Sequence, residues 1–467
     1  MTIQSINPAT EEVLASFDEA TAAQIDEALT NARAGFDRWR ATGFGERSSA
    51  LHAAAAYLRA NKDRFAGLIT AEMGKPIVEA EAEIEKCAVG CDFYADHAER
   101  FMADRPVAST ARESLVAFQP LGPVLAIMPW NFPFWQAVRF AAPALMAGNT
   151  AVLKHAPNVP QCALAIEEVF HAAGLPEGGF QTLLIGTDPV PDIIADDRIA
   201  AVTLTGSVAA GRAVAAMAGR AIKKTVLELG GSDPFIVLPD ADLEGAVDIA
   251  VRARYQNAGQ SCIAAKRFIL VDEIADAFEA RFAAAVAALR VGDPTSRETQ
   301  IGPMARADLR AGVERQVRES VAQGARVLTG GETLDRRGHY YAPTVLADVR
   351  PSMPAFREEV FGPAAAVIRV RDAEAAVATA NNSAYGLGGN LWTRDTERGK
   401  ILARRIESGN VFINGMTASD PRLPFGGVKH SGYGRELSSF GIHEFVNVQT
   451  IWIGPAQGAA PSSPPAE

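Results

Sequence analysis

The stretch LGPVLAIMPWNFPFWQAVRFAAPALMAGNTAVLKHAP, residues 121–157, decides the fold class. It predicts a strand at VLAIM (124–128), a helix over 133–147 and a second strand at TAVLK (150–154), with short joints of Pro, Gly and Asn. The alternation continues in the strand-like segments FQTLLIG (180–186), AVTLTGS (201–207) and KTVLEL (224–229). Strands separated by helices in this way are typical of βαβ units, so the pattern predicts an α/β fold with a parallel sheet.

A second alternating series predicts a second α/β domain. Its strand-like segments are DPFIVL (233–238), RFILVD (267–272), ARVLTGG (325–331), AAVIRV (365–370), GLGGNLWT (386–393) and GNVFING (409–415). The first hundred residues are predicted to be helices, because apolar residues recur at helical spacing from Ile25 to Trp39. A late strand, FVNVQTIWI (445–453), is expected to pair either with the segment near residue 118 or with a sheet edge of another subunit. The segment 456–467 is expected to be disordered.

Composition excludes several classes of partner. A net charge of -10 without Lys/Arg clusters argues against a nucleic acid or an anionic membrane surface. The most apolar windows are broken before the roughly 20 residues that a membrane span needs, and no secretory signal pattern is present. Four cysteines are too few for a disulfide framework, so we expect a cytoplasmic protein. Cys87 and Cys91 lie four residues apart, but no second pair at ligand spacing accompanies them, and no metal site is expected.

Two features point to a phosphate or ribose ligand. Lys154 is predicted at the carboxyl end of a strand, where parallel sheets bind their ligands. In LTGSVAAG (204–211), Gly206 and Ser207 form the turn before a helix that contains Gly211. The exposed N–H groups at such a helix start can hold phosphate oxygens, although a Gly-Ser turn is also common as a simple helix cap.

Three further residues suggest carbonyl chemistry, and each could instead have a purely structural role. Cys262, in YQNAGQSCIAAKR (255–267), is either a nucleophile or a small buried residue. Glu228 ends a predicted strand, where burial would suit it as a general base, or it is a surface residue beside a turn. Asn131 is either an amide donor to an oxyanion or a helix cap. Together with a phosphate-binding turn, these groups fit attack on a carbonyl, hydride transfer to a nicotinamide and hydrolysis of a thioester.

The chain resembles the NAD(P)-dependent aldehyde dehydrogenase superfamily over about residues 3–455. The matching motifs are PWNFP (129–133), Lys154, TGS (205–207), LELGG (227–231), GQSC (259–262), EEVFGP (358–363), GNVFIN (409–414) and PFGGVKHSGYGRE (424–436). Several motifs are similar to those of the succinate semialdehyde dehydrogenase branch. The resemblance implies an α/β fold with three parts. These are a Rossmann-like cofactor domain (1–105 and 125–232, with a late segment near 425–440), an α/β catalytic domain (233–424) and a small β flap (106–124 and 441–455) that joins subunits into homodimers or homotetramers.

The resemblance also implies roles for single residues. Cys262 is the expected nucleophile, Glu228 the base, and Asn131 with the Cys262 N–H the oxyanion hole. Lys154 is expected at the adenosine ribose and Ser207 at the pyrophosphate. The other implied cofactor contacts are Trp130, Pro157, Gly206, Gly211, Leu229, Gly230, Glu359 and Phe361. Many NAD-preferring relatives have a Glu where this chain has Pro157, so we expect both NAD and NADP to be usable.

The expected substrate is a short aldehyde with a carboxylate, such as succinate semialdehyde. Arg139 lies one helical turn beyond Trp135, so both are expected to line the aldehyde channel, with Arg139 pairing with the far carboxylate. Ser419 could add a hydrogen bond. A surface ion pair is the alternative for Arg139. Other open functions are oxidation of glutarate semialdehyde, broad aldehyde specificity, and a non-catalytic protein that holds the cofactor.

Overall fold

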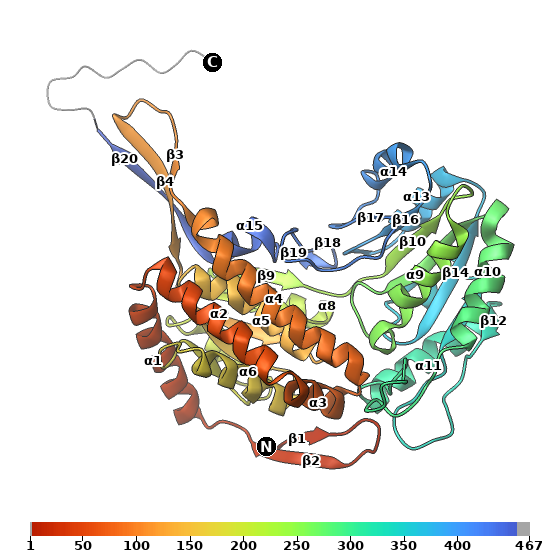
Figure 1. The fold of residues 1–467 in the computed structure, drawn as a ribbon, viewed down its shortest axis with the longest axis horizontal. Coiled ribbons are helices and arrows are strands. Elements are labelled where there is room, and N and C mark those ends of the chain that lie inside the picture. Colours follow the sequence, from red (N-terminus) through yellow and green to blue (C-terminus); the bar gives the residue numbers. More distant parts are fainter. Residues whose placement is uncertain (1, 455–467) are drawn as a thin grey trace.

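Two β-sheets, each covered by helices on both faces, form most of the structure, and a narrow β arm projects from them (Figure 1). The structure is a computed structural model that describes residues 2–454. The predicted tail, 456–467, lies outside the described residues. In the part of the chain that is described, no helix is both long and apolar enough to cross a membrane.

The first sheet contains the strands predicted from the opening stretch. In spatial order its strands are β19 (Gly432–Tyr433), β9 (Lys224–Glu228), β8 (Ala201–Thr205), β5 (Pro123–Met128), β6 (Thr150–His155) and β7 (Phe180–Thr182). All neighbouring pairs are parallel except β19 with β9. The chain builds β5, β6 and β7 outward and then returns to place β8 on the other side of β5. The strand order therefore reverses between β5 and β8, and such a reversal creates a crevice at the carboxyl edge of the sheet.

Alternating side chains of β5 explain why helices cover both faces of this sheet. Val124, Ala126 and Met128 belong to the core under one helical layer, whereas Leu125 belongs to the core on the opposite face. The first layer consists of α2 (Phe44–Ala60), α3 (Lys62–Met73), α4 (Ile77–Met102), α5 (Pro133–Met146) and α6 (Pro160–Ala172). The opposite layer consists of α1 (Ala22–Trp39), α7 (Val190–Ala195) and α8 (Val208–Arg220). Burial on both faces is what a central parallel sheet requires.

The second sheet follows in the chain and has the same architecture. In spatial order its strands are β12 (Arg326–Thr329), β13 (Thr344–Ala347), β14 (Ala364–Val370), β11 (Ala265–Val271), β10 (Asp233–Val237), β16 (Asn390–Trp392) and β17 (Phe412–Ile413). Its helices are α9 (Leu243–Tyr255), α10 (Asp272–Ala287), α11 (Ala307–Ala322), α12 (Pro354–Arg357), α13 (Ala373–Asn381) and α14 (Thr396–Ala403). The predicted α/β fold class is confirmed, although β13 was not among the predicted strands.

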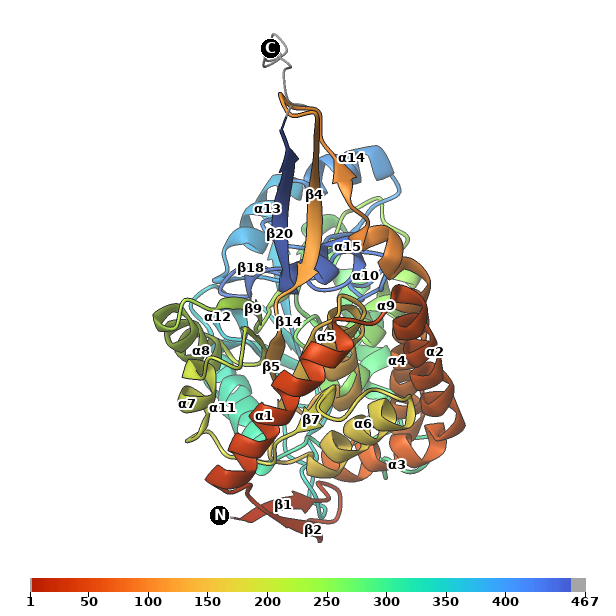
Figure 2. The same cartoon turned by 90° about the vertical axis from the view of Figure 1, so that its left-hand side faces the viewer.

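The first twenty residues depart from the prediction of helices. They form a hairpin of β1 (Thr2–Ile6) and β2 (Val13–Asp18), at the lower edge of the molecule in Figure 2. Along β1, Ile3 and Ser5 are buried and their neighbours are exposed. This period of two over five residues is too short to be noticed beside the long helical pattern that follows it. The hairpin is held to α3, because the Ser5 hydroxyl donates to the Glu72 carboxylate at 2.7 Å.

The late strand pairs with the segment near residue 118, as one of the two alternatives predicted. β20 (Val446–Ile453) runs antiparallel to β4 (Glu113–Pro120), and β3 (Arg105–Pro106) completes the arm. Figure 2 shows β20 and β4 extending together beyond the helices. The outer part of β20 exposes apolar side chains, with Val448 at 61% and Trp452 at 54% exposure.

A short late segment closes the first sheet at the strand that carries Glu228. It contains β18 (Val428–Lys429), which pairs with β15 (Tyr385–Gly386), then β19, α15 (Ser438–Ile442) and the 3-10 turn η2 (His443–Phe445). In β19, Gly432 lies opposite Glu228 and has φ of 109°. A Cβ at Gly432 would lie 1.9 Å from the carbonyl oxygen of Leu227. Only glycine therefore lets β19 approach β9 this closely.

Replacing Gly432 with Ala should lower the free energy of unfolding by about 1–3 kcal/mol, because the methyl group forces β19 away from β9 and strains the backbone. Gly219→Ala is the matched control, since Gly219 lies in α8 with no atom within 4 Å of the added carbon. The control should be neutral or slightly stabilising, as expected for an exposed helical glycine. The midpoint of urea unfolding measures both, and equal midpoints for the two variants would contradict the close approach.

Candidate active site

The carboxyl edge of the first sheet gathers four of the predicted site residues. Asn131 follows β5, Lys154 lies near the end of β6, Ser207 follows β8, and Glu228 ends β9. Because these strands are parallel neighbours, their carboxyl ends meet at one edge, on both sides of the point where the strand order reverses. The sheet topology thus brings together residues that lie up to 97 positions apart in the sequence.

Cys262 reaches this edge from the second sheet, on a tight turn between α9 and β11. The turn contains the 3-10 segment η1 (Gln256–Gly259), in which residues 257–259 have left-handed φ values of 54°, 52° and 71°. Such values cost about 1–2 kcal/mol for a residue with a side chain, so other contacts must hold the turn. The buried Lys266 ammonium does so, by donating to the carbonyl oxygens of Ser261 (2.9 Å) and Cys262 (2.8 Å). Lys266 was not singled out from the sequence.

Asn131 links the two sheets directly beside Cys262. Its side-chain Nδ2 donates to the carbonyl oxygen of Gln260 at 2.9 Å, and its own carbonyl accepts from Asn257 Nδ2 at 2.8 Å. An amide has two N–H donors, so one remains for another acceptor. The Cys262 N–H also donates to no acceptor in the described part of the chain. The two donors predicted to stabilise an oxyanion are therefore available.

The start of α5, which carries Asn131 just before it, is capped by a residue that the sequence did not reveal. Glu83 of α4 accepts the backbone N–H groups of Phe134 and Trp135, each at 3.0 Å, and forms a buried ion pair with Lys75. A carboxylate is favourable here because the first N–H groups of a helix lack partners and carry a partial positive charge. The cap fixes the position of the PWNFP turn.

Glu228 is buried with no hydrogen-bond partner for either carboxyl oxygen among the described residues. Burial raises the pKa of Glu228 well above its usual value, and the nearby Glu436 carboxylate raises it further, while Arg139 acts to lower it. Gly426 leaves room for this carboxyl, because a Cβ there would lie 2.8 Å from Glu228 Oε1. Glu228 therefore keeps its proton to a higher pH than an exposed glutamate does, and neither of its oxygens is held by a hydrogen bond among the described residues.

The surroundings of Cys262 favour the neutral form of its thiol. Burial raises its pKa to about 12, and the positive charges of Arg139 and Lys266 oppose this shift without cancelling it. Glu359 and Glu228 act in the same direction as burial. Since a thiolate is the reactive form, a base must remove the thiol proton before attack.

The residues expected to hold a dinucleotide lie at one edge of the sheet and offer polar groups that suit such a ligand. The buried Lys154 side chain makes no hydrogen bond among the described residues, and the amide atoms of nearby Asn158 are buried without partners. Ser207 is the N-cap of α8, accepting the Ala210 N–H at 3.2 Å, so the capping alternative holds and the helix start is still exposed beside it. Unpartnered polar groups and an open helix start at one sheet edge suit ribose and phosphate oxygens.

Glycines and aromatic rings shape the rest of this edge. Gly211 lets Leu229 pack on α8, since a Cβ there would lie 2.6 Å from the leucine methyl groups. A Cβ on Gly230 would lie 2.3 Å from Glu359 Oε2. Rings of Trp130 and Phe361, from the first and second sheets, meet edge to face with centroids 5.8 Å apart. Gly206 forms the turn after β8, next to Ser207.

His155 adds no positive charge to this edge, although the sequence left that open. Its Nδ1 accepts the Ala156 N–H and its Nε2 contacts the Pro133 carbonyl oxygen, which requires the neutral ring. Burial lowers the pKa of His155 to about 4. Pro157 is exposed. Lys154 is therefore the cation at this position that can meet a phosphate.

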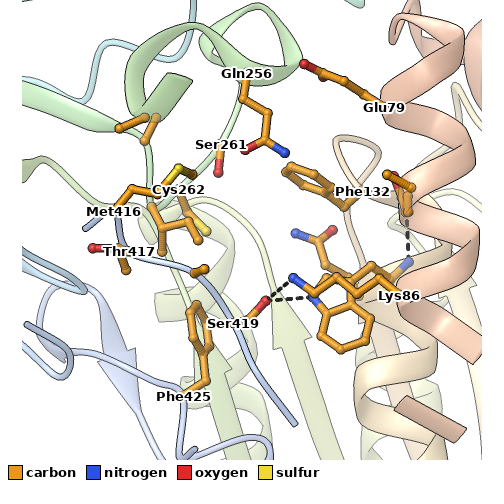
Figure 3. A pocket seen from close by; sticks show the side chains of 18 of the residues that line it. Glu79, Lys86, Phe132, Gln256, Ser261, Cys262, Met416, Thr417, Ser419 and Phe425 are labelled. Carbon is orange, nitrogen blue, oxygen red and sulfur yellow. Dashed lines mark hydrogen bonds between the residues drawn. The ribbon is translucent and has the colours of Figure 1, made fainter. Parts of the chain in front are cut away.

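A cavity of about 460 Å³ opens beside Cys262, between α4 and α5, the Cys262 turn and the loop after β17 (Figure 3). Its polar lining residues are Glu79, Glu83, Lys86, Gln136, Arg139, Arg252, Gln256, Ser261, Thr417 and Ser419, with Phe132, Trp135, Met416 and Phe425 among the apolar ones. All three predicted substrate residues, Trp135, Arg139 and Ser419, line it. Figure 3 shows Cys262 on one side of the cavity and Lys86 with Ser419 on the other.

Two cations in this cavity differ from the sequence-based expectation. Arg139 is buried, so the surface ion pair is excluded, but its Nε forms a buried ion pair with Glu436 Oε2. Its guanidinium also lies over the Phe425 ring, 4.7 Å from the centroid. Lys86, on α4, was not predicted, because nothing in its helical surroundings distinguishes it from a surface lysine.

The other cysteines belong to the core. Cys87, Cys91 and Cys162 are fully buried, and all are free thiols. Burial raises the pKa of Cys91 to about 12 and that of Cys87 and Cys162 well above the usual value. These thiols are therefore held in the neutral form.

Sequence comparison decides the family to which this site belongs. The family model described as "Aldehyde dehydrogenase family" matches residues 1–451. The chain belongs to the aldehyde dehydrogenase family. It is 54% identical over 453 residues to a probable succinate-semialdehyde dehydrogenase [NADP(+)] of Synechocystis sp., covering 97% of this chain and 100% of the relative. It is also 54% identical over 448 residues to a succinate semialdehyde dehydrogenase [NAD(P)+] of Escherichia coli, covering 96% and 97% of the two chains.

Solved structures of the family agree with this assignment. The crystal structure of succinic semialdehyde dehydrogenase from Streptococcus pyogenes in complex with NADP+ superimposes with a TM-score of 0.95, at 40% identity, over 97% of this chain and 100% of that chain. The structure described as giving insights into cofactor and substrate selection by Gox0499 superimposes with a TM-score of 0.96, at 45% identity, with the same coverage. The family fold thus extends over the described chain, including the β arm.

Cys262→Ala should reduce aldehyde oxidation by at least about a thousandfold, because the attacking sulfur is removed. Cofactor affinity should change by less than about threefold, since the sulfur is not among the groups expected to hold ribose or phosphate. The reduced cofactor's absorbance measures turnover and calorimetric titration measures affinity. Cys91→Ala, which alters a buried cysteine of α4, is the control and should retain activity. Residual activity of Cys262→Ala close to that of the control would exclude Cys262 as the nucleophile.

The raised pKa of Glu228 predicts a rate that increases with pH. Below that pKa the carboxyl is protonated and cannot act as a base, so kcat/KM for an uncharged aldehyde should rise with pH above the range in which an exposed glutamate titrates. Glu228→Gln should lower kcat/KM by about a hundredfold or more and flatten this rise. The exposed Glu244→Gln should leave the profile unchanged. A Glu228→Gln profile with the slope of the wild type would assign the titration to another group.

Proposed function

We propose that this aldehyde dehydrogenase oxidises a short aldehyde bearing a carboxylate, succinate semialdehyde to succinate, with NAD+ or NADP+. The observation that carries the proposal is the cavity in which the Cys262 thiol shares one space with the Arg139 guanidinium and the Ser419 hydroxyl. A nucleophile and anion-binding groups in one cavity suit a substrate with an aldehyde at one end and a carboxylate at the other. The names of the Synechocystis and E. coli relatives support the same substrate.

In the proposed reaction, Glu228 in its ionised form accepts the thiol proton as Cys262 attacks the aldehyde carbon. The resulting oxyanion accepts hydrogen bonds from Asn131 Nδ2 and the Cys262 N–H, which are both available. When bound, NAD(P)+ supplies the acceptor for the hydride that leaves the same carbon. After Glu228 has released the thiol proton to solvent, its carboxylate takes a proton from the water that attacks the thioester carbon. The carbon–sulfur bond then breaks, the acid leaves, and the Cys262 sulfur regains a proton from Glu228. The retention of Cys262, Glu228 and Asn131 in one place argues against a protein that only holds the cofactor.

Both cofactors are proposed because position 157, where many NAD-preferring relatives have a Glu that would repel a 2′-phosphate, is a proline in this chain. Pro157 replaces the carboxylate and the Lys154 ammonium is near it in the chain. Burial lowers the pKa of Lys154, but the Glu19 carboxylate raises it and thus favours the charged form. The relatives are named for NADP(+) or NAD(P)+, in agreement with this proposal.

We further propose that the six-stranded sheet belongs to the cofactor-binding part, the seven-stranded sheet to the catalytic part, and the β arm to an interface in a homodimer or homotetramer. The exposed apolar side chains of Val448, Ile451 and Trp452 support the last point, because they would be buried by a second subunit. A cytoplasmic location stays a prediction that the free cysteines support.

A kinetic panel tests the proposed function. Semialdehydes of three to six carbons and uncharged aldehydes of equal length should be compared with each cofactor. We expect kcat/KM for succinate semialdehyde to exceed that for butanal by at least about tenfold, as a buried interaction with one carboxylate provides. The values for NAD and NADP should differ by less than about a thousandfold, roughly 4 kcal/mol.

Each other result of the panel has a definite meaning. A higher value for glutarate semialdehyde would move the substrate to the longer homologue. Equal values for charged and uncharged aldehydes would show broad specificity and contradict the carboxylate proposal. No turnover with any aldehyde would support the non-catalytic alternative, and a preference above a thousandfold for NAD would contradict the account of position 157.

A further inference from the structure

The side of the cavity away from Cys262 contains an ammonium group without a counter-ion. Lys86 projects from α4 into the cavity, with its Nζ 2.7 Å from Ser419 Oγ and 4.5 Å from the centroid of the Trp135 ring (Figure 3). We propose that Lys86 and Ser419 together bind the carboxylate of the substrate, with Lys86 as the principal charge. This inference rests on the proposed function and adds to it a residue that determines specificity.

The hydrogen bonds of Ser419 fix the orientation of the Lys86–Ser419 pair before any substrate binds. Its oxygen accepts from Lys86 Nζ and from Trp135 Nε1, at 2.7 Å and 3.0 Å. A hydroxyl has two acceptor positions and one donor, so both acceptor positions are occupied and the O–H must point elsewhere. The hydroxyl is therefore fixed as a donor, and Lys86 keeps two further N–H donors. A carboxylate, which is an acceptor at both oxygens, matches this pair.

The carboxylates near Lys86 already have other partners. Glu83 forms its buried ion pair with Lys75, and Asp420 pairs with Arg422 at 2.5 Å. Lys86 itself forms no ion pair within residues 2–454. The charge of Lys86 is thus not neutralised by the protein at close range.

Arg139 is in the opposite situation, because the buried Glu436 carboxylate is in direct contact with it. Its charge also acts on Glu228 and Cys262. A substrate carboxylate that approached Arg139 would have to share it with Glu436. Lys86 can take the same carboxylate without such competition, so we assign to it the larger part of the discrimination between charged and uncharged aldehydes.

Electrostatics favours an anion at this position. Burial lowers the pKa of Lys86 to about 8, and the positive charge of Arg139 on α5 acts in the same direction, whereas Cys87, Glu83 and Asp420 oppose it. A bound carboxylate would compensate the two cations and raise the pKa of Lys86. The stack against the Trp135 ring limits the freedom of the ammonium, which reduces the entropy lost on binding.

The test compares Lys86→Met with Lys86→Arg, using succinate semialdehyde and butanal as substrates. Lys86→Met keeps an unbranched side chain one atom shorter and removes the charge, and its KM for succinate semialdehyde should rise by about tenfold to a hundredfold. Its kcat with either substrate, and its KM for butanal, should change by less than about threefold. Lys86→Arg keeps the charge and should restore most of the loss. Ser419→Ala should raise KM for succinate semialdehyde selectively but by a smaller factor.

Inhibition of butanal oxidation by butyrate, with butyramide as the uncharged control, separates this inference from the proposed function. It requires turnover of butanal only, so it works whichever aldehyde the enzyme prefers. The inhibition constant of butyrate should rise at least about tenfold in Lys86→Met and recover in Lys86→Arg, with circular dichroism confirming the fold of each variant. Unchanged butyrate inhibition in Lys86→Met, or equal rises in KM for both aldehydes, would overturn the role of Lys86. A wild type that favours butanal, together with Lys86-dependent inhibition by butyrate, would overturn the proposed substrate alone.

Discussion

The carboxyl group of Glu228 is buried at the end of β9 with no hydrogen-bond partner in the described chain, and the site is arranged around this constraint. Burying such a group costs about 1–3 kcal/mol, and more if it ionises. The first sheet can hold it there because β9 is fixed by β8 on one side and by β19 on the other, where Gly432 lies opposite Glu228. The cost maintains a carboxyl group that favours its neutral form and acts as a base only after it has lost its proton, which a change in the neighbouring charges can promote.

Arg139 connects this carboxyl to the rest of the site. Its charge acts on Glu228, Glu436 and Cys262 together, and its contact with Glu436 is direct. The buried guanidinium therefore has a structural task besides any contact with substrate, since its removal would leave two buried carboxyl groups without compensation. The proposed recognition of an anionic substrate therefore relies on Lys86, a second cation in the same cavity that forms no ion pair in the described chain.

The fold class and most of the strands could be predicted from the sequence, because alternation over stretches such as 121–157 directly reflects burial on both faces of a sheet. The predicted strand ends pointed to Lys154 and Glu228, since strand ends in a parallel sheet meet at one edge. Ser207 was predicted from the helix start that follows its strand, and Asn131 from the hydrogen bond that its amide can donate. The N-terminal hairpin was missed because its alternation is short and precedes a strong helical pattern.

Contacts between distant segments could not be predicted in this way. The ion pair of Arg139 with Glu436 joins residues 297 positions apart, and the bond from Lys86 to Ser419 joins residues 333 positions apart. Lys266 fixes the Cys262 turn and Glu83 fixes the start of α5. No motif in the neighbouring sequence indicates either role. The chemistry available to a single residue could be predicted from its type. Which charged residues pair with one another could not, because the pairs depend on how α4, α5 and the late loop pack against one another.

The most direct test of this account is the protonation state of Glu228 in the unliganded enzyme, measured by infrared difference spectroscopy between the wild type and Glu228→Gln. The account predicts a carbonyl stretch of a protonated carboxyl that persists to a higher pH than it does for an exposed glutamate. Replacement of the protonated band by carboxylate bands in the pH range of an exposed glutamate would contradict it.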